Sequence, residues 1–253
     1  MVQGPTGILQ RALRALGLRG AAGAPLPPDL DEATAATIRA VRPFTMTSDL
    51  RIAALCDAVR HVVRNGIAGD VVECGVWRGG SMMAAARTLL QLGETQRHLW
   101  LFDTFDGMPE PGDADVSIHG EFAGALMRSS SKADPASIWC YASLSDVEAA
   151  MRSVGYDAAR IHYVQGRVED TLPREAPDRI AVLRLDTDWY ESTRHELEHL
   201  YPRLCVGGVL IIDDYGHWQG VRRAVDEYVE RTGAALYLQR IDYTGRSAVK
   251  WRA

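Results

Sequence analysis

Four aspartates that follow two apolar runs are the residues of this chain best suited to chemistry. They are Asp186 and Asp188 after the run 181–185, and Asp213 and Asp214 after the run 209–212. Short apolar runs are typical of strands buried in a parallel sheet, and such sheets bind ligands at the carboxyl ends of their strands. Carboxylates crowded there repel one another unless a cation lies between them. Because oxygen ligands suit Mg²⁺, Ca²⁺ or Mn²⁺, we expect a divalent-metal site in an α/β enzyme.

A second cluster of residues that can bind a ligand spans Glu73 to Ser81, a Gly-rich segment between an expected strand and an expected helix. Glycines there let a ligand approach the backbone closely, but the segment is neither GxGxxG nor a P-loop. Glu73 would repel a pyrophosphate, whereas it suits a ligand with a sulfonium and an ammonium group. Asp103, at the end of the next expected strand, suits the two hydroxyls of a ribose. Together these features indicate S-adenosylmethionine.

The elements that must position these residues alternate between helices and strands. We expect helices over 5–18, 32–41, 49–65, 81–92, 144–154, 190–200 and 219–232, and strands over 71–74, 98–102, 161–164, 181–185, 209–212, 235–241 and 246–251. This alternation predicts an α/β fold. A polar insertion at about 106–145, with a short helix near 120–130, directly follows a strand end. Long insertions in that position are typical of binding lids.

The composition limits the classes of function. The chain has 253 residues, of which 47% are apolar, and a net charge of −5. This length suits one α/β domain with a full core, and the slight acidity does not indicate nucleic acid or an anionic membrane as a partner. No apolar run approaches the roughly 20 residues that span a bilayer. Four cysteines without a CxxC pair favour reduced thiols, so we expect a cytoplasmic protein.

Four segments together carry a resemblance to a known family. They are GDVVECGVWRGGS (69–81), FDTFDGMPEP (102–111), LRLDTDWYEST (183–193) and GGVLIIDDYGHWQG (207–220). The chain from Thr45 onward resembles the TylF/MycF family, metal-dependent O-methyltransferases that act on sugar hydroxyls of macrolides and related natural products. The resemblance implies a Rossmann-like class I methyltransferase fold, with a mostly parallel seven-stranded sheet between two layers of helices. It also implies a catalytic domain over 45–253 and an N-terminal helical extension over 1–44.

The resemblance also implies roles for individual residues. The metal, Mg²⁺ or another divalent cation such as Mn²⁺, falls to Asp186, Asp213 and Asp214. Asp186 is also implied as the general base, although the residues by themselves do not choose between Asp186 and Asp188. The methionine half of the cofactor falls to Glu73, Gly75, Arg78, Gly79 and Ser81, the ribose to Asp103, and the adenine to Gln165 and Gly166. Thr45, Met46 and Ser48 resemble a segment that closes over the cofactor, and Tyr190 and His217 are our candidates for contacts to the acceptor.

The acceptor is the least determined part of the function. We predict methylation of a sugar hydroxyl held by the metal in line with the methyl donor, by a protein that forms a dimer or larger homo-oligomer. A catechol or phenol acceptor remains an alternative, as does a non-catalytic binding protein on the same fold. The chain has Asp-Thr-Asp at 186–188 where antibiotic-modifying relatives have Asp-Gly-Asp. Its lid is also rich in Ser, Asp and Gly. The acceptor could therefore be a glycoside different from those of the antibiotic-modifying relatives.

Overall fold

A mixed seven-stranded sheet forms the centre of the protein in the computed structural model, which describes residues 26–134 and 137–252. The strand order is β3-β2-β1-β4-β5-β7-β6. The strands are β1 (Asp70–Cys74), β2 (Leu99–Asp103), β3 (Ile161–Gln165), β4 (Ile180–Leu185), β5 (Leu204–Ile212), β6 (Gln239–Arg240) and β7 (Arg246–Val249). The first five pair in parallel, and β7 is antiparallel to both β5 and β6. The predicted fold class is confirmed, while the helix expected over 5–18 lies outside the described residues.

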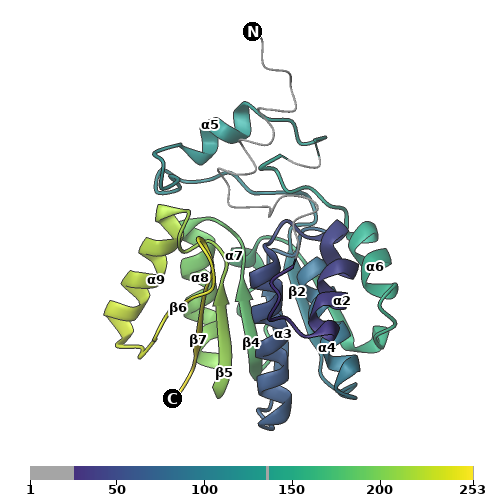
Figure 1. The fold of residues 1–253 in the computed structure, drawn as a ribbon. Coiled ribbons are helices and arrows are strands. Elements are labelled where there is room, and N and C mark those ends of the chain that lie inside the picture. The colour runs from purple at the N-terminus through teal and green to yellow at the C-terminus, as the bar shows by residue number, and fades with distance from the viewer. Residues whose placement is uncertain (1–25, 135–136, 253) are drawn as a thin grey trace.

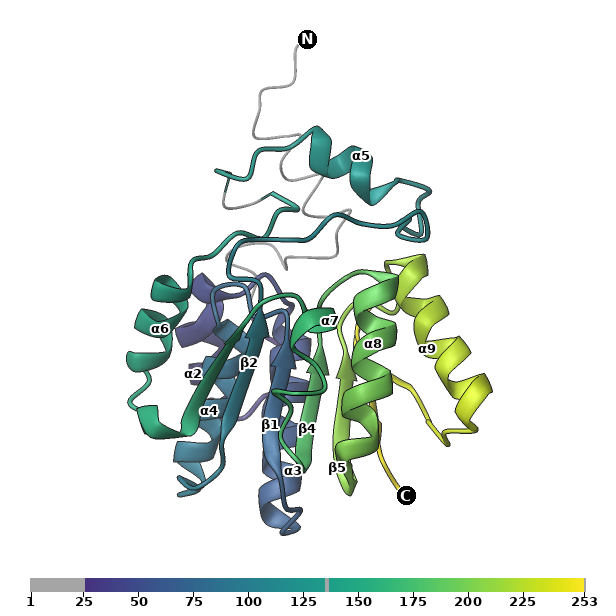
Figure 2. The same cartoon turned by 180° about the vertical axis from the view of Figure 1, so that it is seen from behind.

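Helices cover both faces of this sheet (Figures 1 and 2). The α-helices of the described residues are α2 (Glu32–Val41), α3 (Asp49–Arg64), α4 (Gly80–Gln91), α5 (Ala123–Arg128), α6 (Leu144–Arg152), α7 (Val168–Thr171), α8 (Tyr190–Leu200) and α9 (Gln219–Thr232). Of these, α5 lies apart from the sheet, in the insertion between β2 and α6. One apolar core joins α2, α3, α4 and α6 to one face of the sheet, and a second joins α8 and α9 to the other face. Among the described helices, none has the length and apolarity to cross a membrane.

The strand register brings the chemically important residues to one edge. Glu73 of β1 lies opposite Arg184 of β4, and Arg184 lies opposite Ile211 of β5. Backbone hydrogen bonds continue the ladder past the strand ends, from Asp186 N to the carbonyl of Cys74 and from Asp213 N to the carbonyl of Leu185, both 2.9 Å. Because the strands run in parallel, their terminal acidic residues meet at the same carboxyl edge.

The segment before α3 belongs to the body of the domain. Helix α2 packs on α3 and α4, and its Ile38 and Val41 are buried in the first core. The chain then crosses the start of α4 so closely that a Cβ on Gly80 would lie 2.6 Å from the carbonyl oxygen of Phe44. Part of the segment assigned from the sequence to an N-terminal extension therefore completes the core, and residues 44–47 lie above the Gly-rich loop.

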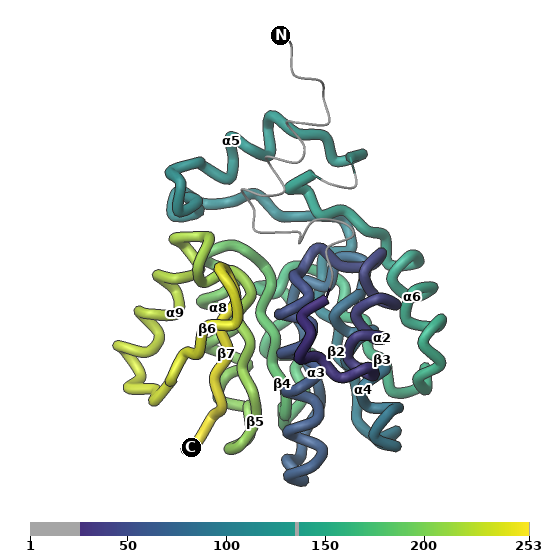
Figure 3. The backbone as a smooth tube through the Cα atoms, viewed as in Figure 1, coloured from purple at the N-terminus to yellow at the C-terminus, as the bar shows by residue number. Residues whose placement is uncertain are grey.

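The lid connects β2 to α6 above the carboxyl edge of the sheet (Figure 3), and its helix α5 is shorter than the 120–130 expected. Asp115 fixes the lid to the domain, because its Oδ1 accepts a hydrogen bond from Tyr190 N at 2.8 Å and its Oδ2 one from Gly112 N at 2.7 Å. The indole of Trp189 donates to the carbonyl of Pro109 at 3.1 Å. An antiparallel bridge joins Ser117 to Trp218. The lid is thus docked on the turns that follow β4 and β5.

The C-terminal strands are shorter than the sequence pattern indicates. We expected strands over 235–241 and 246–251, but β6 comprises only Gln239–Arg240 and β7 ends at Val249. Strand β6 is the edge of the sheet and pairs with β7 alone. Short edge strands present few unpaired backbone groups, which is a common way to limit pairing with other chains.

Gly220 tests how closely the lid is docked. A Cβ at this position of α9 would overlap Oδ1 of Asp115 and lie 3.1 Å from Cβ of Tyr190. Helix propensity alone predicts that Gly220→Ala stabilises α9 by about 1 kcal/mol, whereas we expect a loss of about 1–3 kcal/mol because the lid must shift. Urea unfolding measures the difference. Gly112→Ala is the control, since its nearest contact would be an ordinary 3.7 Å; equal effects of the two substitutions would contradict a tightly docked lid.

Candidate active site

A pocket lies between the carboxyl edge of the sheet and the lid. Eleven of the residues singled out from the sequence line it: Thr45, Met46, Glu73, Gly75, Ser81, Asp103, Gly166, Asp186, Asp188, Asp213 and Asp214. The lid contributes an apolar wall that includes Met108, Pro109 and Ile138, and Trp218, the N-cap residue of α9, adds to this wall. The fold thus brings residues that lie more than 160 positions apart in the sequence into one cavity.

Glu73 gives the pocket an unused acceptor. Its side chain is 1% exposed, and its Oε1 pairs with Arg184. Its Oε2 is buried and has no hydrogen-bond partner among the described residues. Burial raises the pKa of Glu73 to about 7 although the guanidinium of Arg184 opposes the shift. A buried oxygen without a donor is costly, so this position fits the ammonium group of a ligand such as S-adenosylmethionine.

Asp103 holds the Gly-rich loop as well as lining the pocket. Its Oδ2 accepts hydrogen bonds from the backbone N–H groups of Val76 at 2.7 Å and Trp77 at 3.1 Å, and its Oδ1 accepts from Phe105 N at 2.8 Å. Burial raises the pKa of Asp103, and these three bonds oppose the shift. The hydroxyl of Thr104 also donates to Oδ1 at a long 3.4 Å. Of the roughly four acceptor sites of a carboxylate, only the one with this weak contact is available to a hydroxyl of a ligand. The sequence suggested the ribose contact but not the loop-holding role.

Two glycines let the loop take its path. Gly75 has a φ of +81°, and a Cβ there would overlap the carbonyl oxygen of Asp186. Gly79 has a φ of +84° and forms the N-terminal cap of α4. Position 75 therefore requires glycine for two reasons. Only glycine adopts this backbone conformation at no cost, and only glycine leaves room for the backbone at the end of the neighbouring strand. Trp77 has a φ of +45° and is strained at the same turn.

Three further carboxylates gather in the same pocket. One oxygen each of Asp186, Asp188 and Asp214 lies within 4.8 Å of the others. Burial raises the pKa of Asp188 to about 7 and the pKa values of Asp186 and Asp214 well above their usual range, and mutual repulsion adds to each shift. Asp188 reaches this cluster through a left-handed turn with φ of +64°. Three oxygen donors with excess negative charge fit a divalent cation.

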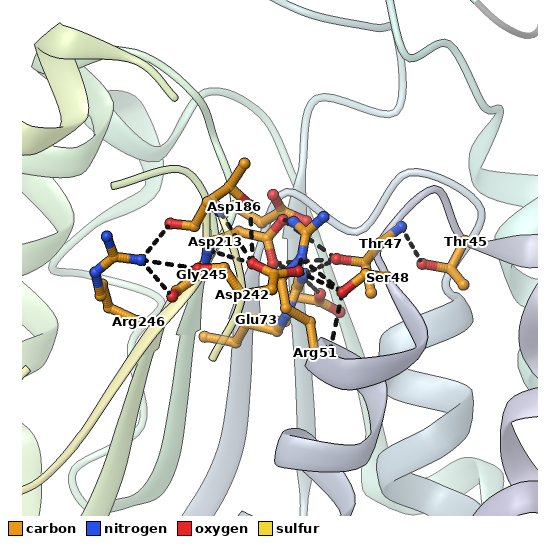
Figure 4. A network of polar contacts seen from close by, with 12 residues as sticks. Thr45, Thr47, Ser48, Arg51, Glu73, Asp186, Asp213, Asp242, Gly245 and Arg246 are labelled. Atoms are coloured by element: carbon orange, nitrogen blue, oxygen red, sulfur yellow. Dashed lines mark hydrogen bonds and ion pairs between the residues drawn. The ribbon is translucent and has the colours of Figure 1, made fainter. Parts of the chain in front are cut away.

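Asp213, by contrast, belongs to a network of buried ion pairs (Figure 4). Its Oδ1 pairs with Arg184 and its Oδ2 with Arg51. The hydroxyl of Thr47 donates to the same two oxygens at 3.1 and 3.2 Å. Arg51 also pairs with Asp242 at 3.0 Å. Both oxygens of Asp213 thus accept from arginines and Thr47, whereas Asp188 lies with Asp186 and Asp214 in the carboxylate cluster.

The arginines of this network were absent from the sequence-based site. Arg51 and Arg184 are 1% and 2% exposed. The pKa of each is raised, because the surrounding carboxylates outweigh the effect of burial. Arg184 carried a readable signal, since a cation inside an otherwise apolar strand must find a buried partner. Arg51 carried none, because it sits in an ordinary amphipathic helix.

Six residues predicted for the site do not line the described pocket: Ser48, Arg78, Gly79, Gln165, Tyr190 and His217. Ser48 caps α3, accepting from Arg51 N at 3.2 Å, and donates to Asp242. The hydroxyl of Tyr190 donates to Glu227 at 2.6 Å on the surface. His217 lines a separate groove beside α9, and its Nδ1 lies 3.2 Å from the hydroxyl of Tyr243. The structure therefore does not support Tyr190 or His217 as contacts in this pocket.

Comparison with known proteins identifies relatives of this arrangement. The family model described as macrocin O-methyltransferase (TylF) matches residues 28–253. The chain is 39% identical over 214 residues to 8-demethyl-8-(2,3-dimethoxy-alpha-L-rhamnosyl)-tetracenomycin-C 4'-O-methyltransferase of Streptomyces olivaceus, a match of 82% of this chain and 75% of the relative. It is 35% identical over 214 residues to mycinamicin III 3''-O-methyltransferase of Micromonospora griseorubida, with 82% and 78% covered. The structure of the O-methyltransferase NovP aligns with a TM-score of 0.74 at 28% identity, covering 98% of this chain and 100% of that one.

The division between Asp213 and the carboxylate cluster has a measurable consequence for stability. In a chelator, Asp213→Asn should lower the free energy of unfolding by about 3–5 kcal/mol, because it leaves two buried guanidiniums without their shared partner. Asp214→Asn, at the adjacent and equally buried position, should leave stability unchanged or raise it by relieving the repulsion with Asp188. Urea unfolding of both variants measures this contrast. Equal losses would contradict the assignment of Asp213 to the ion-pair network.

Proposed function

The chain belongs to the macrocin O-methyltransferase (TylF) family of S-adenosylmethionine-dependent enzymes, and on that premise we propose that it methylates a sugar hydroxyl of a glycosylated natural product or another glycoside. The two relatives named above support this acceptor class, since one is named as a 4'-O-methyltransferase of a rhamnosyl-bearing tetracenomycin C and the other as a 3''-O-methyltransferase of mycinamicin III. The pocket of this chain is further support, because its acidic residues form two chemically different groups.

The observation that carries the proposal is that both groups line one cavity. Glu73, with its unused buried oxygen, and Asp103 would form the donor subsite, and Asp186, Asp188 and Asp214 would form the acceptor subsite. S-adenosylmethionine supplies an electrophilic methyl group on a sulfonium. Glu73 would bind its ammonium group, Asp103 a ribose hydroxyl, and the turn at Gly166 would lie beside the adenine. Such fixed placement of both reactants replaces an encounter in solution by a preset geometry.

Asp186 is the proposed base for the acceptor hydroxyl. An alcohol is a weak nucleophile at neutral pH, so a carboxylate within reach must accept its proton as the new bond to carbon forms. Arg184 donates to Oδ2 of Asp186 at 2.6 Å, and its charge opposes the effect of burial on the pKa of this carboxyl. The apolar wall of Met108, Ile138 and Trp218 would exclude water and contact the carbon skeleton of the acceptor.

A divalent cation, Mg²⁺ or Mn²⁺, is the second cofactor that we propose. When bound, it would lower the pKa of the acceptor hydroxyl and hold the oxygen in place. As two of its ligands we propose Asp186 and Asp214, which the resemblance implies and whose carboxylates lie close together in the pocket. For the third ligand we propose Asp188, because its carboxylate lies within the cluster while both oxygens of Asp213 accept from arginines and Thr47. Asp213 would then orient the site without binding the metal.

The function is tested by donor binding followed by an acceptor panel. We expect S-adenosylmethionine to bind in calorimetry and the enzyme to methylate rhamnosides or other glycosides, but not catechol, with Mg²⁺ present. Excess EDTA and Asp186→Asn should each reduce turnover by at least about a thousandfold, whereas the exposed control Asp178→Asn should retain it. Methylation of catechol but of no glycoside would show that the acceptor is a phenol rather than a sugar. Absence of donor binding at millimolar concentration would reject the methyltransferase proposal.

The third metal ligand is tested by Mn²⁺ binding measured with electron paramagnetic resonance. Asp188→Asn should weaken Mn²⁺ by about tenfold or more, because loss of a ligand or its supporting contact commonly has that effect. Asp213→Asn, measured at a temperature where the variant is folded, removes a supporting contact rather than a ligand and should weaken Mn²⁺ less than Asp188→Asn does. The opposite order would assign the third position to Asp213, as the resemblance implies.

A further inference from the structure

Arg184 is a cation in the middle of the sheet. It lies on β4 between the apolar residues Leu183 and Leu185, directly opposite Glu73 of β1, and its side chain is 2% exposed. Moving a charge out of water is expensive, and only close pairing with several acceptors offsets that cost. The position of Arg184 therefore depends on the carboxylates around it, and those carboxylates depend on Arg184.

The two terminal nitrogens of its guanidinium, Nη1 and Nη2, contact different side chains. Nη1 contacts both Oε1 of Glu73 and Oδ2 of Asp186, the latter at 2.6 Å. Nη2 contacts Oδ1 of Asp213 and donates to the hydroxyl of Thr47 at 3.0 Å. Because the guanidinium is planar and its donors have fixed directions, these contacts set the positions of the carboxylates relative to one another.

The cations of the network are fewer than the carboxylates that pair with them. Among the described residues, Arg51 and Arg184 form ion pairs with four carboxylates, those of Glu73, Asp186, Asp213 and Asp242. Nη1 of Arg184 is thus shared between one carboxylate of the proposed donor subsite and one of the proposed acceptor subsite. A change in the charge or position of the Glu73 carboxylate therefore alters the interaction of Nη1 with the Asp186 carboxylate, and the reverse also holds.

We propose that Arg184 is a positioning residue that couples the methyl-donor subsite at Glu73 to the cation and acceptor subsite at Asp186. This inference rests on the proposed function, because it takes Glu73 as the contact for S-adenosylmethionine and Asp186 as a contact for the divalent cation. Arg184 itself lies behind both carboxylates and does not line the described pocket. Occupation of one subsite changes the affinity of the other through the shared guanidinium, and by linkage the effect is reciprocal.

Arg51 provides a matched control. Its side chain is buried to the same depth, carries the same charge and shares Asp213 with Arg184. Its second ion pair goes to Asp242, on the loop before β7, at 3.0 Å. A lysine at either position keeps one positive charge but lacks the fork that holds two carboxylates at once. Arg184→Lys and Arg51→Lys should therefore cost similar stability while differing in their effect on coupling.

The experiment measures the dissociation constant of S-adenosylmethionine by calorimetry without and with saturating Mn²⁺, on the full chain. In the unsubstituted protein the two constants should differ by about fivefold or more, the lower range of typical coupling between sites. Arg51→Lys should keep this ratio within about twofold, and Arg184→Lys should bring it to about one. Direct repulsion between Mn²⁺ and the sulfonium would survive Arg184→Lys, because the lysine leaves both ligands in place.

A ratio near one in the unsubstituted protein, or an unchanged ratio in Arg184→Lys, would overturn the inference. If circular dichroism shows that Arg184→Lys is unfolded, Thr47→Val replaces it, since this variant removes one support of Nη2 without changing any charge. It should reduce the ratio at least twofold toward one, and an unchanged ratio would again overturn the inference. Failure of the unsubstituted protein to bind S-adenosylmethionine or Mn²⁺ would instead reject the proposed function.

Discussion

The buried ion pairs of Asp213 with Arg51 and Arg184 are the interaction on which the rest of this site depends. They join α3, β4 and β5 at the carboxyl edge of the sheet, and Thr47 ties the segment above the Gly-rich loop to the same point. Charges at this depth are stable only while every partner is present. The network therefore fixes the relative positions of three elements that would otherwise be held by apolar packing alone, and packing tolerates shifts that a catalytic geometry does not.

The excess of carboxylates over guanidiniums gives the pocket its chemistry. The arginines neutralise part of the negative charge at the strand ends, and what remains is concentrated at Glu73 and at the cluster of Asp186, Asp188 and Asp214. Burial and mutual repulsion raise the pKa values of these groups. An ammonium or sulfonium group beside Glu73 and a divalent cation at the aspartate cluster would relieve this repulsion. The electrostatic arrangement would thus favour cationic ligands at both places.

The lid supplies the apolar side of the pocket and is fixed rather than free. Asp115 accepts hydrogen bonds from the backbone on both sides of the junction, and Trp189 and Trp218 pack edge to face with ring centroids 5.1 Å apart beneath it. The turns that carry Asp188 and Asp214 are therefore also the turns on which the lid rests. A change of acceptor in this fold would require changes in the lid residues that face the carboxylates, while the donor end could stay as it is.

The sequence by itself determined the fold class, the strand ends and the family, because apolar periodicity and short motifs are local properties that survive in a linear reading. Asp186 and Asp214 at strand ends, and Glu73 and Gly75 in the Gly-rich loop, follow from such signals. The tertiary structure decided which carboxylates lie together. Arg51 reaches Asp213 across 162 positions of sequence, and the left-handed turn at Asp188 directs its carboxylate into the cluster. Partner choice among like-charged side chains depends on distances of a few ångströms, which the packing of α3 against β4 and β5 sets and no spacing along the chain encodes.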